Sequence, residues 1–323
     1  MSRPTSSRST LADALFGWPP PVLDPGGPYS ASISTLAWVL IGLMTAVFLI
    51  VLAALAVALF GSPALKQKLG GERTILLGGL AFPTVVLTGL LVWGLTLTSH
   101  LAGPLTGAEQ RVRVTGHMWW WRVAYLDSQG AIVSHDANEL HIPVGQPVVV
   151  ELESADVVHS FWVPELAGKL DMVPGRRNLL RIQADRAGVY GGQCAEYCGG
   201  AHALMGFVVV AHEPAEYARW LAARTAPQTA QASGRGAALF QEAGCAACHR
   251  IAGTAAQGMA GPDLTHVASR HSLGAGILPN NRGTLTGWIS NAQAIKHNNR
   301  MPAYTMLPPE DLAEIVTYLE TRQ

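Results

Sequence analysis

Four side chains that can bind a soft metal ion lie close together in the chain. They are Cys194, Cys198, His202 and Met205, set four, four and three residues apart. Thiolate and imidazole groups suit copper and zinc, whereas a thioether is rare on zinc and common as a weak copper ligand. Two cysteines in one loop indicate two metal ions that share both sulfurs, and such a site needs a second imidazole from elsewhere. The alternative is a disulfide between Cys194 and Cys198, as exported proteins often form.

A second cysteine pair is followed directly by histidine, in the order Cys245-Ala-Ala-Cys248-His249. This pattern is the attachment signature of haem c, with two thioether bonds and His249 as the proximal iron ligand. A thioredoxin-like redox pair is the alternative, but it requires a strand–helix–strand context. Residues 238–244 instead predict a short helix that leads into the motif. A downstream methionine is the expected sixth ligand, because Met/His ligation raises the haem potential. The candidates are Met259, Met301 and Met306.

The composition limits the class of protein. The 323 residues carry 22 basic and 22 acidic side chains, and this zero net charge does not suggest nucleic-acid binding. Hydrophobic residues make up 49% and charged residues 14%, which is too apolar for an ordinary soluble protein and predicts membrane spans. The four cysteines form the two pairs described above, so they indicate cofactor sites rather than a disulfide framework.

Two long apolar segments predict a transmembrane helix hairpin over residues 33–100. Residues 33–60 and 75–98 carry no charge, and each exceeds the roughly 20 residues that cross the hydrocarbon core. The connection between them has three basic side chains against one acidic one, so the positive-inside bias places it in the cytoplasm. Everything after residue 100 then faces outward. Residues 1–32 are predicted to be a flexible lead without a signal-peptide core.

The chain changes character at residue 101, where short β-rich runs separated by Gly, Pro and Asp begin. Many short strands with regular turn signals predict a sandwich or barrel, here assigned to residues 101–223. On a strand, Trp119 and Trp121 would share one face and Trp120 would take the other. The expected strands are residues 111–115, 119–125, 148–152, 157–163, 178–182 and 207–212.

A short helix is predicted at residues 214–223, and the polar, small residues 224–233 are predicted to be a mobile linker. A new unit over residues 234–323 follows the linker and carries the haem motif. Its last helix should open with Pro309, Glu310 and Asp311, which are good first-turn residues. An apolar stripe at helical spacing is expected to form the core against the haem. It consists of Leu312, Ile315, Val316 and Leu319.

The metal-binding stretch resembles the dinuclear copper (CuA) loop of cytochrome c oxidase subunit II, Cys-x-Glu-x-Cys-x3-His-x2-Met, and every position of that pattern is present. The resemblance implies that Cys194 and Cys198 bridge two copper ions. It also implies that His202 ligates one of them and that Met205 is a weak ligand.

The same resemblance assigns two further residues to the copper site. Glu196 would give its backbone carbonyl, and its side chain would help to hold a magnesium ion shared with subunit I. The second imidazole would be His159, in the segment Val-Val-His-Ser-Phe-Trp-Val-Pro. The resemblance implies a cupredoxin-like β-barrel with His159 and the copper loop at one end.

Residues 234–323 resemble a class I cytochrome c, an all-α domain. Gly261-Pro-Asp-Leu matches the family's Gly-Pro-x-Leu loop, in which the Pro262 carbonyl would orient the proximal His249; such a bond fixes the imidazole tautomer. Met301-Pro-Ala-Tyr matches the family's Met-Pro-x-Tyr. Met301 is therefore the expected sixth ligand, and Met306 is the second choice.

The segment Gly116-His-Met-Trp-Trp-Trp is similar to the subunit II pattern Gly-His-Gln-Trp-aromatic-Trp, with Met118 in place of Gln. The resemblance implies that Trp119 is the exposed point at which electrons enter from cytochrome c. A core-packing role is the alternative for this tryptophan cluster. Asp171 lies in a segment that also resembles the family. Two interpretations of Asp171 are open: it belongs to the donor-docking or magnesium region, or it caps a turn.

A subunit II with a fused cytochrome c resembles the caa3-type oxidases. The resemblance implies a relay in which haem c passes electrons to CuA and then to subunit I, where oxygen reduction drives proton pumping. Expected partners are subunits I and III and an upstream cytochrome or bc1-type donor, in a bacterial inner membrane with both cofactor domains on the periplasmic side. Many members carry a Glu early in the second span, but here the nearest carboxylate is Glu72, for which an interfacial charge is the preferred interpretation.

Three other classes of protein share parts of this pattern. A stand-alone membrane-tethered carrier would have the same sequence features. A copper nitrite reductase with a fused cytochrome would need a further His cluster and usually one Cys per copper loop. A quinol-oxidase subunit II would lack the copper ligands, so it is excluded. The remaining histidines are expected to bind no metal. They are His100, His117, His135, His141, His212, His266, His271 and His297, of which His117, beside the tryptophans, is the likeliest exception.

Overall fold

The computed structural model describes residue 14 and residues 21–101, 109–227 and 234–323. The chain forms two compact units, one made of Met1–Ser30 with Gly107–Gln323 and the other of Ala31–Thr106. Most of the predicted lead, residues 228–233 of the predicted linker and the side chain of His100 lie outside the described residues. Within the predicted lead, the backbone N–H of Gly26 donates to the Glu165 carbonyl at 2.7 Å, and the Gly26 carbonyl accepts from Asp185 at 2.8 Å.

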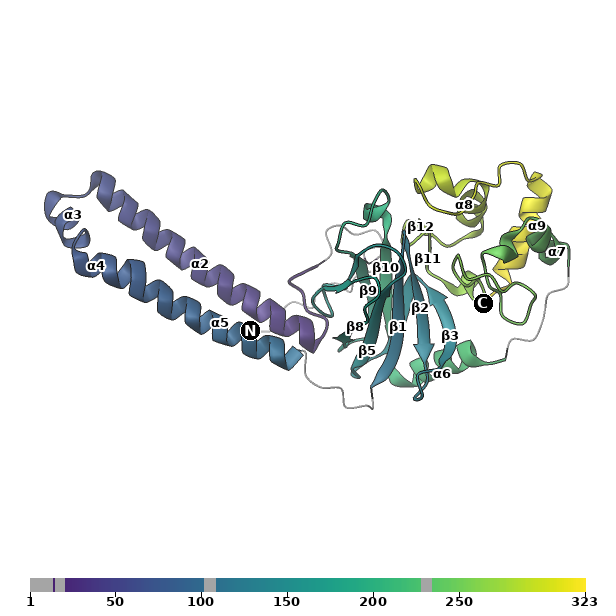
Figure 1. Ribbon diagram of the computed structural model, residues 1–323, viewed down its shortest axis with the longest axis horizontal. Coiled ribbons are helices and arrows are strands. Elements are labelled where there is room, and N and C mark those ends of the chain that lie inside the picture. The colour runs from purple at the N-terminus through teal and green to yellow at the C-terminus, as the bar shows by residue number, and fades with distance from the viewer. Residues whose placement is uncertain (1–13, 15–20, 102–108, 228–233) are drawn as a thin grey trace. The chain divides into compact units, whose positions relative to one another are not determined.

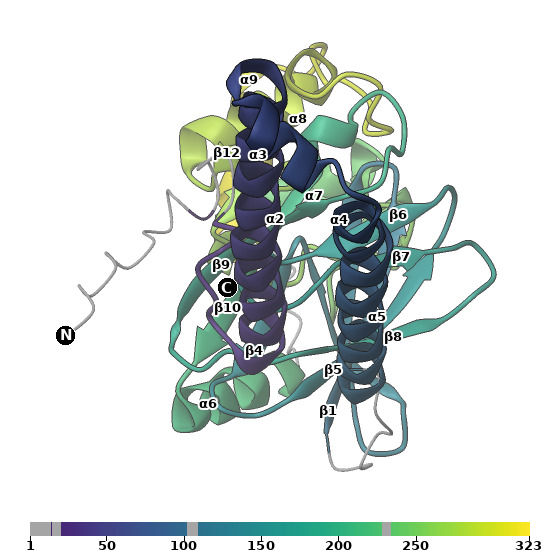
Figure 2. The same cartoon turned by 90° about the vertical axis from the view of Figure 1, so that its left-hand side faces the viewer.

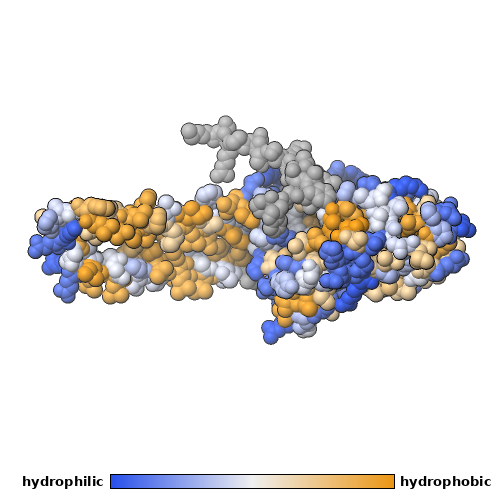
Figure 3. Space-filling view, turned by 90° about the horizontal axis from the view of Figure 1, so that it is seen from above, coloured by the Kyte–Doolittle hydropathy of each residue, from blue (hydrophilic) through white to orange (hydrophobic). Residues whose placement is uncertain are grey.

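Two long helices make up the predicted hairpin (Figures 1 and 2). Helix α2 spans Pro28–Phe60 and α5 spans Phe82–Leu101; between them lie α3 (Pro63–Leu69), α4 (Glu72–Leu76) and the π-helical turn η1 (Leu77–Ala81). Both long segments are apolar enough to cross a membrane, and Figure 3 shows apolar side chains (orange) along them. Helix α2 starts five residues before the predicted span. The π-turn was not predicted; it directly precedes Phe82 and Pro83, where proline removes a backbone donor.

The β-rich region is a sandwich of two five-stranded sheets, in the orders β3-β2-β1-β5-β8 and β4-β10-β9-β6-β7. Strands β1 and β5 pair in parallel, as do β4 and β10, whereas the other neighbouring strands of each sheet are antiparallel. This arrangement confirms the predicted sandwich. The strands are β1 (Gln110–His117), β2 (Trp120–Leu126), β3 (Ile132–Ala137), β4 (Glu139–Pro143), β5 (Val148–Ser154), β6 (His159–Trp162), β7 (Leu170–Met172), β8 (Asn178–Ile182), β9 (Gly188–Cys194) and β10 (Gly206–His212).

The sandwich core follows from strand periodicity. Along β1, Val112 and Val114 are buried while their neighbours are less so, as expected when successive side chains point to opposite faces. Trp121 lies fully inside, packed against Phe161 and Phe207 with ring centroids 6.0 and 5.0 Å apart. The core therefore extends to the end of the sandwich that carries His159, because β6 contributes both His159 and Phe161.

The predicted placement of the tryptophans was wrong in one respect. Strand β1 ends at His117 and β2 begins at Trp120, so Trp119 lies in the connection between them and not on a strand. The strict alternation of faces therefore does not apply to it. Strands β3, β4, β7 and β9 were also not predicted.

The C-terminal domain is mostly helical and follows α6 (Pro214–Thr225), the predicted short helix. In α9 the predicted apolar stripe is buried and packs with Phe240 of α7 and Ile251, which confirms its core role. Helix α8 was not predicted. The elements are α7 (Arg235–Glu242), η3 (Cys245–Ala247), η4 (Val267–Ser269), β11 (Ser272–Leu273), β12 (Leu278–Pro279), α8 (Arg282–Ile295) and α9 (Pro309–Glu320).

The helical domain packs on the sandwich within one compact unit. Buried Arg270 donates to the Asp136 carboxylate at 2.8 Å. The backbone N–H of Gly206 donates to the Ala275 carbonyl at 3.0 Å. Arg122 of β2 donates to the Met259 carbonyl. These contacts join the helical domain, which contains Cys245–His249, to the sandwich, which contains Cys194–Met205.

Candidate metal centre and haem site

The predicted copper ligands converge in one cluster, in which His202 is half-buried and His159, Cys194, Cys198 and Met205 are buried. The Sγ atoms of Cys194 and Cys198 lie 3.7 Å apart, and both cysteines are free. His159 Nδ1 is 3.8 Å from Cys194 Sγ, and His202 Nδ1 is 3.4 Å from Cys198 Sγ. Met205 Sδ is 3.8 Å from Cys198 Sγ. Two thiols, two imidazoles and a thioether that face one another are a donor set for copper.

Two strand ends and a tight loop position these donors. Cys194 is the last residue of β9, and the chain returns through the 3-10 helix η2 (His202–Leu204) to Met205, just before β10. The backbone N–H of Cys194 donates to the Met205 carbonyl at 3.1 Å and closes the loop. The Glu196 carbonyl lies 3.3 Å from Cys194 Sγ, so it faces the cluster as the resemblance implies. The five side chains and one carbonyl expected from the sequence are thus brought together.

The two cysteine sulfurs alter each other's acidity. The hydrogen bond between the sulfurs lowers the pKa of Cys194 and raises that of Cys198. A metal ion that binds both sulfurs as thiolates would displace the remaining thiol proton.

Two residues outside the ligand set fix the orientation of His159. Its Nε2 lies 2.9 Å from the Asp156 carboxylate, which leaves Nδ1 facing Cys194. Gly116 lies against the ring, where a Cβ would be only 2.8 Å from Cδ2 of His159. Carboxylate partners of this kind hold metal-binding imidazoles in position. Asp156 was not predicted as a site residue; its position three residues before His159 was the available signal.

Substituting Gly116 with alanine should displace the His159 ring and weaken copper binding by about tenfold to a hundredfold, the usual cost of disturbing groups that orient a metal ligand. Copper retained after dialysis against a graded chelator series measures the effect. Gly287→Ala is the control, because nothing lies within 4 Å of the Cβ it would add. Equal copper retention in the two variants would show that Gly116 does not set the position of His159.

The carboxylate of Glu196, proposed to help hold magnesium, is partly exposed. Its nearest charged neighbour is Lys169, whose Nζ lies 3.8 Å from Glu196 and 3.9 Å from Asp171. Asp171 lies on β7, so it is not in a turn. The two carboxylates thus share one lysine at the surface, next to the copper loop.

A cavity of about 550 Å³ lies between the sandwich and the helical domain. Its size is in the range of cofactor pockets, about 300 to 1,000 Å³. Cys245, Cys248 and His249 line it from the helical side, with Trp119 and Trp120 on the sandwich side. Both predicted attachment cysteines and the predicted proximal histidine therefore open into one space, which fits a covalently attached haem.

The proximal histidine is held as predicted. His249 Nδ1 lies 2.7 Å from the Pro262 carbonyl, which leaves Nε2 for the iron. Gly261 allows this approach, since a Cβ there would lie 2.6 Å from Cε1 of the His249 ring. Burial lowers the pKa of His249, which favours the neutral imidazole that a metal ion requires.

The methionine candidates differ in where they lie. Met301 lines the cavity and packs against the core of the helical domain, and its carbonyl accepts from Gln293 at 2.7 Å. Met259 also lines the cavity but is 38% exposed. Met306 is 93% exposed and is not among the lining residues. The arrangement favours Met301 as the sixth ligand.

Trp119 lies between the two sites. It is 8% exposed, so the expectation of an exposed residue was wrong; here the helical domain adjoins it across the haem cavity. Its indole N–H donates to the Cys198 carbonyl at 2.9 Å. One side chain thus contacts the copper loop and lines the cavity, whereas Trp120 stacks on His117 with ring centroids 4.5 Å apart.

A carboxylate of the sandwich also holds the helical domain. The buried Glu139 accepts from the backbone N–H of His271 at 2.6 Å and lies 3.0 Å from His271 Nδ1. Burial would raise the pKa of Glu139, but the imidazoles of His141 and His271 lower it to about 2. The hydrogen bond to Glu139 raises the pKa of His271 above 6.5.

The contact between the two domains should therefore depend on pH. The folded state raises the pKa of His271. The Glu139–His271 pair therefore stabilises the contact between the two domains fully below pH 6.5, and this stabilisation is lost as the pH rises through the raised pKa of His271. Hydrogen exchange at Ser272, whose N–H also donates to Glu139, should accelerate over that range, beyond the intrinsic effect of pH. His271→Gln should remove the extra pH dependence, and substitution of the exposed His297 should not. A profile identical in wild type and His271→Gln would contradict this role.

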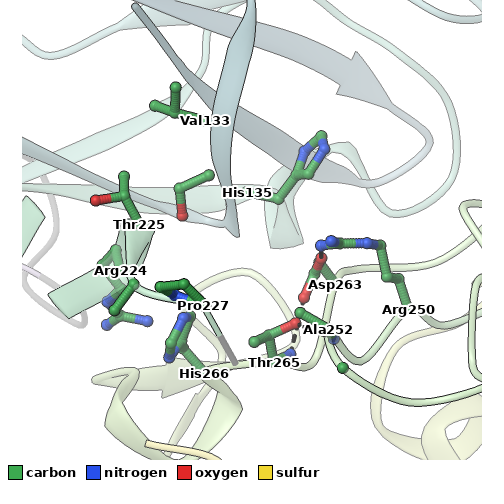
Figure 4. A pocket seen from close by; sticks show the side chains of 13 residues that line it. Val133, His135, Arg224, Thr225, Pro227, Arg250, Ala252, Asp263, Thr265 and His266 are labelled. Atoms are coloured by element: carbon green, nitrogen blue, oxygen red, sulfur yellow. Dashed lines mark hydrogen bonds and ion pairs between the residues drawn. The ribbon is translucent and has the colours of Figure 1, made fainter. Parts of the chain in front are cut away.

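A second, smaller cavity of about 230 Å³ is bordered by residues that directly follow His249 and Pro262 in the chain (Figure 4). It is bordered by His135 of β3, by Arg224 at the end of α6, and by Arg250 and Asp263 of the helical domain. Arg250 is paired with Asp263 at 2.5 Å. No cysteine or methionine lines it, so it is not part of the haem or copper sites.

Comparison with known proteins gives matches over both cofactor domains. The family described as cytochrome C oxidase subunit II, periplasmic domain, matches residues 128–212, and the cytochrome c family matches residues 233–323. Cytochrome c oxidase subunit 2 of Alkalihalophilus pseudofirmus is 35% identical over 313 residues, 93% of this chain and 90% of that protein. Its counterpart in Bacillus subtilis is 28% identical over 281 residues, 80% and 78% of the two chains. A solved periplasmic domain of cytochrome oxidase subunit II from Bradyrhizobium japonicum is 30% identical, covers 36% of this chain and 94% of its own, and has a TM-score of 0.34.

Proposed function

Because the chain belongs to the cytochrome c oxidase subunit II family, we propose that it relays electrons from a covalently bound haem c to a dinuclear copper centre and on to subunit I of a caa3-type oxidase. In this complex, oxygen reduction in subunit I is coupled to proton pumping. The cytochrome c domain at residues 233–323 supports the caa3 type, because it supplies a second electron carrier on the same chain.

The observation that carries this proposal is that Trp119 belongs to both sites. The Trp119 indole donates to the Cys198 carbonyl at 2.9 Å, and the same residue lines the cavity that holds Cys245, Cys248 and His249. The proposal makes Trp119 the point at which electrons pass between the two domains.

Each residue has a defined task in this proposal. Cys245, Cys248, His249 and Met301 hold haem c, and His159, Cys194, Glu196, Cys198, His202 and Met205 hold the copper ions. When bound, these cofactors supply one-electron carriers whose iron and copper are fully ligated, which suits electron transfer rather than substrate binding. The Asp156 carboxylate and the Pro262 carbonyl keep the two imidazoles in their ligand orientations. Four of the copper donors, His159, Cys194, Cys198 and Met205, are buried, which limits the access of water to the centre.

The same proposal specifies the membrane, the partner subunits and the electron donor. The helix hairpin anchors the chain in a bacterial inner membrane, with both cofactor domains in the periplasm, and it contacts subunit I and subunit III. An upstream cytochrome or bc1-type complex reduces the haem. Glu196, at the surface beside the copper loop, contributes to a magnesium site at the subunit I interface.

Gentle detergent purification through a tag on this chain tests the function. We expect copper, haem c and the haems of subunit I to copurify, together with the other oxidase subunits. A preparation that contains this chain alone with its two cofactors would instead indicate a stand-alone carrier. A preparation without copper would contradict the assignment of the metal centre.

A further inference from the structure

Lys296 occupies a position that lysine rarely takes. It is the residue after α8 and is 2% exposed, although lysine is almost never fully buried unless its ammonium group is paired. Three backbone carbonyls surround Nζ: those of Trp119 at 2.6 Å, Leu204 at 2.7 Å and Gly274 at 2.8 Å. Each of the three ammonium hydrogens therefore has an acceptor.

The three carbonyls come from the parts of the chain that must meet for electron transfer. Trp119 contacts the copper loop through its indole, as described above. Leu204 is inside the copper loop, between His202 and Met205. Gly274 follows β11, and both Gly274 and Lys296 belong to the helical domain. One ammonium group thus joins the haem domain to the copper loop and to the residue between the two sites.

An apolar side chain could fill this space but could not donate hydrogen bonds to the three carbonyls. A methionine of similar length would avoid the cost of burying a charge, yet it would leave three carbonyl oxygens without a donor. Hydrogen bonds from a charged donor are stronger than neutral ones. Lys296 therefore helps to fix the relative position of three backbone segments that come from different parts of the chain.

We propose that Lys296 is a positioning residue for electron transfer from haem c to copper: its ammonium group holds Trp119 and the copper loop against the haem domain. The inference rests on the proposed function, because it assumes that electrons cross this interface. Lys296 lines the haem cavity, but its ammonium group bonds to the three carbonyls, and we assign it no role as a ligand of either cofactor. Its effect is on the distance and rigidity between the two sites, and small displacements of such pairs have large effects on rate.

The test uses the purified, fully loaded complex and the variant Lys296→Met. After flash reduction of haem c by a photoactive ruthenium reagent, transfer to copper should be slower by about tenfold, which equals about 1.4 kcal/mol in barrier height. The next step, from copper to subunit I, should keep its wild-type rate. The optical spectrum of the haem and the EPR spectrum of the copper should be unchanged, which separates positioning from loss of a site.

A second readout does not depend on electron flow. Hydrogen exchange of Gly206, whose N–H donates to the Ala275 carbonyl across the interface, should be slow in wild type and faster in Lys296→Met. Lys296→Arg, which keeps the charge, should restore part of both the protection and the rate; the planar guanidinium cannot match three converging acceptors as well as an ammonium. Arg282→Met is the matched control, since it removes an exposed cation of α8 paired within the same domain with Glu320.

The outcomes separate this inference from the proposed function. Absence of haem-to-copper transfer in wild type would overturn the proposed function itself. Transfer at the wild-type rate in Lys296→Met would overturn only the role of Lys296. If Lys296→Met does not fold, the wild-type exchange measurement decides, because an unprotected Gly206 N–H would contradict a fixed interface. If Arg282→Met slows haem-to-copper transfer as much as Lys296→Met does, the role of Lys296 is also contradicted.

Discussion

Substituting Cys198 with serine should abolish the dinuclear copper centre and leave haem c attached. Cys198 Sγ lies within 3.8 Å of three other donor atoms, those of Cys194, His202 and Met205, so its loss removes a contact to each of them. A serine hydroxyl is a hard and weakly acidic ligand that cannot replace a bridging thiolate. We expect copper content to fall and the mixed-valence EPR signal to disappear, with the haem optical spectrum unchanged.

Cys248→Ser is the reciprocal control for this experiment. It removes one thioether bond to the haem, and since Cys248 is far from the sulfur cluster in sequence and lines only the haem cavity, copper binding should persist. A mixed-valence copper signal that survives Cys198→Ser would refute the bridging role. Loss of both cofactors in both variants would indicate a general folding defect instead of two separate sites.

Substituting Met301 with leucine should remove the sixth haem ligand. The two side chains are similar in volume, so the cavity should remain filled, but leucine has no donor atom. Since Met/His ligation raises the haem potential, we expect a lower potential and loss of the low-spin Met/His spectrum. Electron delivery through the haem should fall in parallel.

Two other leucine variants identify the ligand by elimination. Met306 is almost fully exposed and outside the cavity, so Met306→Leu should leave the spectrum unchanged. Met259→Leu should do the same, although Met259 lines the cavity. An unchanged Met/His spectrum in Met301→Leu, with a change in either of the other two, would reassign the ligand.

The copper and haem motifs could be predicted because their donors are near neighbours in the sequence. Cys194 to Met205 form one loop, and Cys245 to His249 form another, so residue type and spacing carry the information. His159 could be assigned only through the resemblance to a family, since its pairing with the loop depends on β6 lying beside β9. Nothing in its own spacing indicates this.

Several strands escaped prediction for identifiable reasons. Strand β9 contains Gly191 and Gly192, which predict a loop. In the structure a Cβ at Gly192 would lie 2.3 Å from the Phe207 ring, so the glycine is required by packing. Trp119 was placed on a strand because the local run is aromatic, whereas the chain turns there between β1 and β2.

The interface between the two cofactor domains could not be predicted from periodicity. Lys296 and Trp119 are 177 residues apart, and Asp136 and Arg270 are 134 apart. These contacts pair single polar residues across separate domains, and a lone lysine or aspartate in a sequence carries no sign of its partner. The sequence predicts a mobile linker before the haem domain. Nothing in the residue pattern indicates that buried polar contacts hold this domain to the sandwich.

The most direct test of the central claim is to follow haem c and copper together after a flash that reduces the haem. The account predicts that haem reoxidation and copper reduction share one rate, and that this rate does not change with protein concentration, because both carriers lie on one chain. A haem that stays reduced, or a rate that rises in proportion to concentration, would contradict transfer within the chain.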